Sequence, residues 1–287
     1  MQNNKRRFFR VFIILAIFLL LTSPLWLWWL QTATPISILI VDKTVPDRTY
    51  REHKGLMWAL NHFKYVKESD GSAFDYANDY SGFFPERNEQ FSIHEIPSVT
   101  AEYHVVYLAD TYGVHADDFY QNPSEKAERG MMYGGLTTEE VERIRNALKP
   151  NGTLIAEFNT FGDPTNSEAR QQLENLLGLN WTGWIGQHFD DLSKGVEIPA
   201  WIATNYEKQT SEEWTFGGGG FVLISETDGI VVLSERKDVG DARLSIVFSS
   251  HLLSKEYDGK SELNYSYWFD IVSPGPETEV IADYQFD

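Results

Sequence analysis

The feature that most constrains this chain is an uncharged stretch near its N-terminus, Val11 to Leu30. Twenty residues at about 1.5 Å rise each reach about 30 Å, the thickness of the hydrocarbon core of a bilayer. Four basic residues precede the stretch, and tryptophans crowd its far end, where indole rings favour the headgroup boundary. We therefore predict a signal-anchor helix at residues 11–30, with residues 1–10 cytoplasmic and the main domain outside the cell membrane.

A cleaved secretory signal is the alternative interpretation of this stretch. Its apolar region is then Val11 to Leu21, and its cleavage zone begins at Thr22. No A-x-A-like cleavage site follows, and cleavage leaves the tryptophan-rich sequence LWLWWL as an exposed apolar end. A core helix of the domain is disfavoured because apolar residues cover every face. Both leading interpretations place the domain across the membrane.

The charge and composition of the remaining chain exclude several functions. The formal net charge is −18, and the part beyond the basic N-terminus holds 20 basic against 42 acidic residues. Such a surface repels phosphate backbones, so we expect no nucleic-acid partner. The chain contains no cysteine, which excludes disulfides and thiol nucleophiles. The FGGGGF sequence lacks the lysine and the following helix of a phosphate loop, and no cofactor is expected.

Strands and helices are expected to alternate along the first half of the body. Apolar runs at 35–46, 103–113 and 153–158 are typical of buried strands, and helical periodicity follows each of them. This alternation predicts a mostly parallel sheet with helices on both faces, within an α/β domain at 35–287. Short apolar runs separated by Gly and Asp predict a β-rich extension at 196–287.

Several local predictions follow from helix caps and loop composition. Asp47 is expected to cap a helix that buries Leu56, Met57, Leu60 and Phe63. Thr137 and Glu140 have the spacing of a capping box. Residues 69–88 show no clean period and are expected to form a long loop, whose aromatic part, Phe74 to Pro85, is available to contact another protein.

Three predicted strands end in an acid, namely Asp42, Asp110 and Glu157. Ligands of open parallel sheets bind at the carboxyl ends of the strands, so we expect these carboxylates to meet at one edge. Nearby polar and aromatic residues complete the predicted binding site, with Tyr112, Asn159 and Trp184 as its further members. For Asp42 and Asp110 the competing interpretation is structural, because Asp at such positions commonly accepts hydrogen bonds from the next turn.

Two catalytic alternatives use these acids or a nearby histidine. Glu157 as acid or base predicts a hydrolase, with or without a divalent cation held by Asp42, Asp110 and Glu157. His188, oriented by Asp190 or Asp191, is a second candidate base. No metal-ligand spacing such as H-E-x-x-H supports a metal at His188.

The sequence TTEEVERIRNALKPNGTLIAEFN, as helix, turn and strand after an acid-ended strand, resembles the core of class I glutamine amidotransferase-like domains, which have a flavodoxin-like layout. In that superfamily the strand leads into a G-x-C-x-G elbow, where this chain has Glu157 to Phe161 instead. His251, after LSIVFSS, takes the place of the catalytic histidine without the H-P-E pattern. The resemblance implies a membrane-attached bacterial member that has lost amidotransferase chemistry.

The leading functional hypothesis is therefore a tethered extracytoplasmic domain that binds without catalysing. Carboxylates and amides beside aromatic rings suit the hydroxyl groups and apolar faces of sugars, so an envelope glycan, or a membrane-protein partner that handles one, is the expected ligand. A hydrolase and an assembly scaffold are the alternatives.

Overall fold

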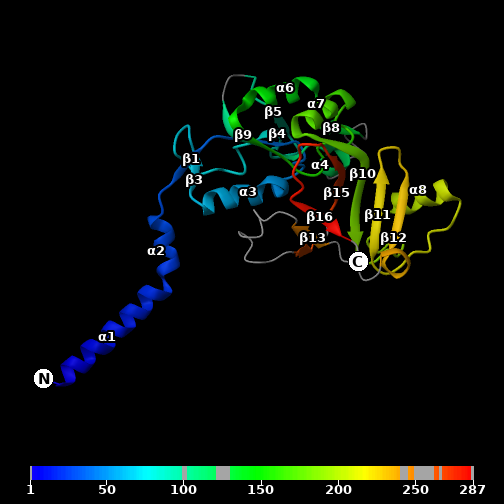
Figure 1. Cartoon of the computed structure of the whole chain (residues 1–287). Helices are drawn as coiled ribbons and strands as arrows, with labels where there is room; N and C mark the ends of the chain where they lie inside the picture. Colours follow the sequence, from blue (N-terminus) through cyan, green and yellow to red (C-terminus); the bar gives the residue numbers. More distant parts are fainter. Residues whose placement is uncertain are drawn as a thin grey trace.

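The computed structural model describes residues 2–98, 102–120, 130–239, 245–248, 262–264 and 267–285 (Figure 1). The described part is a mixed α/β structure with eight helices and with sheets of parallel and antiparallel strands. His251, the residue that the family resemblance singles out, lies outside the described residues.

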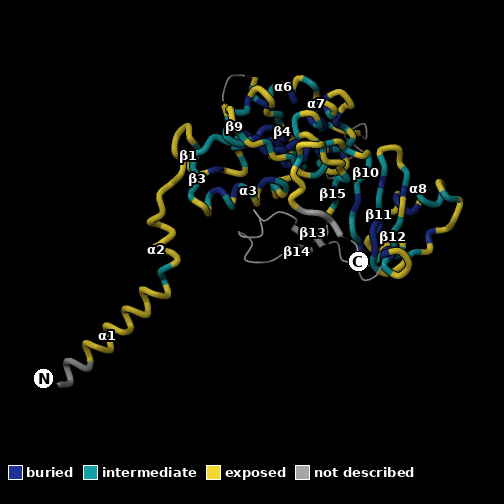
Figure 2. Tube along the Cα trace, in the orientation of Figure 1, coloured by how far each residue is buried: buried dark blue, intermediate teal, exposed yellow. Residues whose placement is uncertain are grey.

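Two consecutive helices form the N-terminal segment, α1 (Gln2–Leu21) and α2 (Ser23–Leu30). They extend away from the domain, and their described side chains are almost all exposed (Figure 2). Within the described residues, no single helix has the length and apolar character of a membrane span. The two helices together do, although they meet at an angle of 57°. The continuous helix predicted at residues 11–30 is thus interrupted at Thr22.

The central sheet has five strands in the order β5-β4-β2-β6-β9. Strands β4 (Ser81–Pro85), β2 (Ile38–Asp42), β6 (Tyr103–Asp110) and β9 (Leu148–Ala156) are parallel, and β5 (Phe91–His94) is antiparallel. The chain first builds outward from β2 to β4 and then crosses to β6 on the other side. The strand order therefore reverses between β2 and β6, the place where open sheets bind ligands.

Helices cover both faces of this sheet, as predicted, because alternate residues of its strands point to opposite sides. Leu39 and Val106 pack on one side with α6 (Thr138–Ala147) and α7 (Ser167–Leu177). Ile40 and Tyr107 pack on the other side with α3 (Arg51–His62), which contributes Met57. The continuous apolar runs of β2 and β6 reflect burial on both faces.

An antiparallel sheet with the order β12-β11-β10-β15 forms the predicted β-rich extension. Its strands are β10 (Leu179–Phe189), β11 (Gly220–Ser225), β12 (Ile230–Ser234) and β15 (Phe269–Pro274). A helix that the sequence analysis did not predict, α8 (Ala200–Thr210), buries Ile202 against this sheet. Because β10 belongs to the sheet, the extension begins earlier than residue 196.

The remaining elements are short. Strands β1 (Thr34–Ile36) and β3 (Tyr65–Lys67) pair in parallel, and β7 (Val114–His115) pairs with β8 (Met131–Tyr133). Helix α4 (Ala116–Phe119) follows β7, and a π-helical turn spans Glu235–Val239. A third sheet contains β13 (Ser245–Phe248), β14 (Glu262–Asn264) and β16 (Ala282–Gln285).

Some local predictions are confirmed and others are wrong. The capping box of Thr137 and Glu140 is present at the start of α6. Asp47 does not cap α3, since its carboxylate instead accepts hydrogen bonds from the backbone and hydroxyl of Thr49. Phe63 lies beyond the helix end and is exposed. The predicted loop at 69–88 contains β4, in which Phe83 and Phe84 are buried.

The burial of Phe83 has a physical basis that its sequence context conceals. Gly82 has φ +142°, and a Cβ built on it meets the carbonyl oxygen of Asp42 at 1.7 Å. Only glycine allows the two backbones to approach this closely, so Gly82, which reads as a loop residue, is needed for strand pairing. The proposed contact of Phe74 to Pro85 with another protein is not possible through Phe83 and Phe84, which lie inside the sheet.

Sequence periodicity predicts that loss of the Phe63 side chain destabilises the protein more than loss of the Phe83 side chain. The structure predicts the opposite. Phe83 is 0% exposed and Phe63 is 66% exposed. Phe83→Ala should lower the free energy of unfolding by about 3–5 kcal/mol, because it removes a fully buried ring and leaves a cavity. Phe63→Ala should change it by less than about 0.5 kcal/mol. Denaturant unfolding of both full-length variants in detergent measures this, and equal losses would contradict the assignment of β4 to the core.

Candidate functional site

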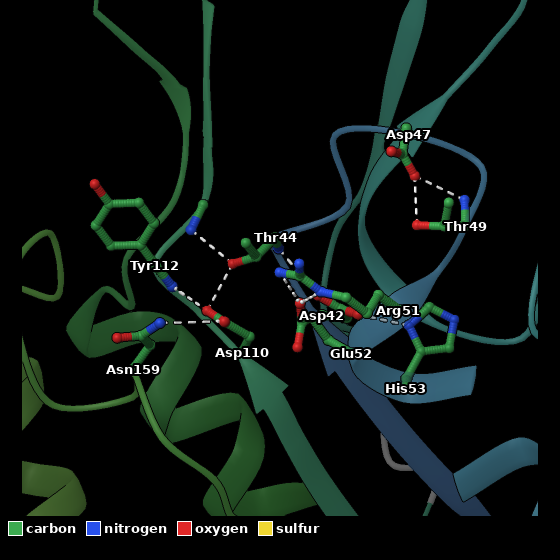
Figure 3. A network of polar contacts seen from close by, with 11 residues as sticks. Asp42, Thr44, Asp47, Thr49, Arg51, Glu52, His53, Asp110, Tyr112 and Asn159 are labelled. Carbon is green, nitrogen blue, oxygen red and sulfur yellow. Dashed lines mark hydrogen bonds and ion pairs between the residues drawn. The ribbon is translucent and has the colours of Figure 1, made fainter. Parts of the chain in front are cut away.

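The carboxyl ends of β2, β6 and β9 lie at the same edge of the central sheet, as predicted. Asp42 is paired with Asp110 in the β2–β6 register, and Glu157 follows the last residue of β9. The three acids therefore start from neighbouring strand ends. Their side chains, however, have different partners, and these partners decide what each acid can do. Figure 3 shows the partners of Asp42 and Asp110.

Asp42 is completely buried and serves the fold. One of its oxygens accepts a hydrogen bond from Thr44 N–H at 3.0 Å, and the other lies 2.6 Å from Nδ1 of His53. His53, also fully buried, has its Nε2 at 2.7 Å from the carbonyl oxygen of Tyr76. That carbonyl can only accept, so Nε2 donates to it, and the contact between Nδ1 and Asp42 is a second hydrogen bond of the ring. The pair binds α3 to β2.

Asp110 is also held by the protein. Its carboxylate accepts hydrogen bonds from the Thr44 hydroxyl at 2.6 Å, Tyr112 N–H at 2.7 Å and the Asn159 amide at 3.3 Å. Burial raises the pKa of Asp110 to about 6, with Asp42 adding to the rise and these hydrogen bonds opposing it. Most contacts of Asp42 and Asp110 are thus hydrogen bonds within the protein, as the structural interpretation of these two acids predicts.

The turn after β9 places Asn159 against Asp110. Asn159 has φ +66°, a left-handed conformation that asparagine tolerates better than most residues. Hydroxyl groups fasten the turn on both sides, since Thr160 donates to the Glu157 carbonyl at 2.6 Å and Thr111 donates to the Asn159 carbonyl at 3.0 Å. The turn is thus a rigid support for the residues on either side of it.

Glu157 differs from the two aspartates because it is partly open to solvent. The Tyr107 hydroxyl donates a hydrogen bond to its carboxylate. Partial burial raises the pKa of Glu157, and this hydrogen bond works against the rise. The expectation that Glu157 follows a fully buried strand was wrong, because β9 is an edge strand and Ile155 is exposed.

A cavity of about 250 Å³ adjoins Glu157, between the carboxyl end of β9 and the strand β15 of the second sheet. Phe158, Phe161 and Phe269 supply aromatic rings to its lining, and Leu177 and Leu179 supply aliphatic surface. A second acidic residue, Asp270, also lines it. We call this space the Glu157–Asp270 pocket.

Asp270 escaped the sequence analysis, although an acid inside the apolar run WFDIV was a detectable signal. Its Oδ1 atom is buried and has no hydrogen-bond partner among the described residues, and the same holds for the indole nitrogen of Trp181. Burial raises the pKa of Asp270 to about 7. The nearby indole of Trp181 and the backbone N–H of Asn159 lower it, and the charge of Asp110 raises it further.

A larger cavity of about 520 Å³ lies at the opposite, amino ends of β2 and β6, and none of the predicted site residues lines it. We therefore place the candidate site at the smaller pocket, which is lined by two acids with raised pKa values, Glu157 and Asp270. Within the described residues, no three His, Asp or Glu side chains are arranged to hold a metal ion, so Asp42, Asp110 and Glu157 do not form the metal set considered from the sequence.

Three other predicted residues lie away from the Glu157–Asp270 pocket. Tyr112 stacks on His115. Trp184 is in β10, where it lies opposite Ser225 of β11 and Ile271 of β15. His188 is in strand β10 and not in a loop, with Nε2 at 3.0 Å from Glu235 and Nδ1 at 3.7 Å from the exposed Asp190. None of them lines that pocket.

Comparisons with known proteins add no relatives. No family model, curated protein or solved structure matches this chain.

The raised pKa of Asp270 predicts how stability changes with pH. The fold favours the protonated acid, so the stabilisation is complete below the unfolded-state pKa of about 3.9 and is lost as pH rises through about 7. Asp270→Asn keeps the shape without titrating. The unsubstituted chain should lose stability between pH 4 and pH 8, whereas Asp270→Asn should not lose this part. The melting temperature of the variant should therefore gain a few degrees on that of the unsubstituted chain over this range, since a change of about 1 kcal/mol in the free energy of unfolding corresponds to about 2–4 °C.

Asp228→Asn, at an exposed turn, is the matched control for the loss of one carboxylate. Melting curves at both pH values measure the two differences. The melting temperatures of Asp270→Asn and of the unsubstituted chain differ by some amount at each pH. If that amount is the same at pH 4 and at pH 8, the Asp270 carboxyl is ordinarily solvated and the prediction is wrong.

Proposed function

We propose that this protein is a membrane-tethered domain that binds a small polyhydroxyl ligand, such as the end of an envelope glycan, in the Glu157–Asp270 pocket. The observation that carries this proposal is a cavity lined by Glu157 and Asp270, two acids with raised pKa values, and by three aromatic residues. A pocket of this kind combines apolar surface with a few convergent polar groups.

The chemistry of the two acids suits hydroxyl groups. With a pKa of about 7, Asp270 is largely protonated in mildly acidic solution, so it both donates and accepts hydrogen bonds. Glu157, which also lines the pocket, offers a further acceptor, and the phenylalanines offer faces for the C–H surface of a sugar ring.

The size of the pocket limits the ligand. Its volume of about 250 Å³ is slightly below the range of about 300–1,000 Å³ that is common for small-molecule sites. One ring or the terminal unit of a longer chain fits this volume better than an extended oligomer. The acidic surface of the body also disfavours ligands with several negative charges.

The order of elements supports a relationship in fold to the class I glutamine amidotransferase-like domains. In this proposal the parallel strands β4-β2-β6-β9 and the turn at Glu157 correspond to the strands and the elbow of that layout. Where the superfamily has its cysteine elbow, this chain has a turn fastened by Thr160 and Thr111. In our proposal the domain keeps the rim of that fold and uses it for binding outside the cell membrane, anchored by α1 and α2.

A hydrolase is the second candidate function, because Glu157 and Asp270 share one cavity and both have raised pKa values. Two such carboxyl groups can serve as general acid and base for the cleavage of a glycosidic bond. In this version Asp270 in its protonated form is the acid and Glu157 is the base. A binding site retains its ligand unchanged, whereas a hydrolase releases a new reducing end.

A thermal-shift screen of the full-length protein in detergent tests the binding proposal. The probes are soluble fragments of envelope glycans and their single sugars. A true ligand at about 100 times its dissociation constant should stabilise the folded state by about 2.7 kcal/mol. Glu157→Gln and Asp270→Asn should each weaken this shift, and Glu142→Gln, an exposed change on α6, should not.

Two results would count against the proposal. A probe that stabilises all four proteins equally binds elsewhere, and a screen in which no sugar shifts the melting temperature removes glycans as the ligand class. Analysis of each stabilising probe by mass spectrometry after incubation separates the two candidates, because cleavage abolished by Glu157→Gln identifies a hydrolase.

A further inference from the structure

An exposed aromatic surface lies where the N-terminal helices join the domain. Trp58, on α3, is 66% exposed, and so is Phe63, just beyond the helix end. The ring of His62 lies between them, stacked on Trp58 at 4.8 Å and edge-on to Phe63 at 5.2 Å. We call Trp58, His62, Phe63 and Lys64 the aromatic edge.

The aromatic edge is bonded directly to α2. The indole N–H of Trp28 donates a hydrogen bond to the carbonyl of His62 at 2.6 Å. The ammonium group of Lys64 lies 3.5 Å from the centre of the Trp28 ring, within cation–π distance. The backbone N–H of Thr34 donates to the Lys64 carbonyl at 2.9 Å, which secures the short connection after α2. The aromatic edge therefore lies beside Trp28, at nearly the same position along the axis of α2.

This position is significant if α1 and α2 cross a membrane, the part of the proposed function on which the inference rests. The uncharged part of α1, Val11 to Leu21, reaches only about 17 Å at about 1.5 Å per residue, less than the hydrocarbon thickness of about 30 Å. The tryptophans of α2 then lie near the outer boundary, where indole rings are favoured. Contact with Trp28 brings the aromatic edge to the same boundary.

Charge favours the same orientation. Residues 51–67 contain four basic residues and one acidic residue, in a body that has 20 basic and 42 acidic residues. Of these basic residues, Lys64 and Lys67 lie where the chain enters the domain next to α2, whereas Arg51 and Lys54 lie at the other end of α3 (Figure 1). Lysine side chains can lay their apolar stems along aromatic surface while their ammonium groups contact lipid phosphates.

We propose that the aromatic edge inserts into the headgroup layer of the bilayer that holds α1 and α2, and so fixes the domain against the membrane. Trp58 and Phe63 contribute apolar ring surface at the depth where amphipathic and aromatic groups are most stable. With this edge down, α8 lies on the part of the domain far from α2 and faces away from the bilayer (Figure 1).

Site-directed spin labelling tests the proposal, and the absence of cysteine makes every introduced cysteine a unique label site. Full-length Phe63→Cys and Trp58→Cys are labelled and reconstituted into phosphatidylcholine vesicles. Trp201→Cys on α8, where the native side chain is 49% exposed, is the matched control. Collision rates with oxygen, which concentrates in lipid, and with a water-soluble nickel chelate are measured for each label.

We expect the oxygen-to-nickel ratio at positions 58 and 63 to exceed that at position 201 severalfold. Equal ratios in protein that alkaline carbonate does not extract would overturn the docking while leaving the tether intact. Protein that carbonate does extract would overturn the tether and the docking together. Two labels that lie close together on different copies of the chain broaden each other's spectra. Broadening that persists after the protein is diluted with excess lipid would place a second copy of the chain on this face, and would also overturn the proposal.

Discussion

The arrangement of the candidate site depends on the hydrogen bonds that hold Asp110. Thr44, Asn159 and the backbone of Tyr112 all donate to this one carboxylate, so the ends of β2, β6 and the turn after β9 are joined at a single buried point. The Thr44 hydroxyl accepts in turn from Gly113 N–H at 2.8 Å. A buried carboxylate is costly unless it is satisfied, and here the protein supplies its partners from three segments. Because this turn is held rigidly, Glu157 and Phe158 enter the neighbouring pocket in fixed positions.

The ion pair between Lys43 and Glu140 attaches a helix on the other side of β2. Lys43, buried next to Asp42, has its ammonium group at 2.6 Å from both the Glu140 carboxylate and the Gly135 carbonyl. Burial lowers the pKa of Lys43, and the Glu140 charge opposes this effect. Glu140 also closes the capping box of α6. Asp42, the last residue of β2, thus binds α3 through His53, and Lys43, which follows the strand, binds α6 through Glu140. This explains why polar residues are retained at the end of such an apolar strand.

The two acids of the pocket and the aromatic edge serve different proposed purposes at separate places. The Glu157–Asp270 pocket lies between the two sheets, and the aromatic edge lies where α2 meets α3. A domain fixed to the membrane surface by that edge has a restricted orientation, and its pocket then faces a limited part of the envelope. Restricting orientation raises the effective concentration of a membrane-proximal ligand without any additional contact.

Periodicity and helix-cap patterns were sufficient to predict the local structure at many positions. The sequence determined the alternation of strands and helices, the capping box at Thr137, the burial of β2 and β6, and the meeting of strand-end acids at one edge, because these depend on short-range spacing. Only the tertiary structure decided that Phe83 is buried and Phe63 exposed, that Asp42 and Asp110 are occupied by internal partners, and that Asp270 and Glu157 line the same cavity. The reason is distance along the chain: Asp270 and Glu157 are more than a hundred residues apart, and only the packing of the second sheet against β9 brings the two residues to one pocket.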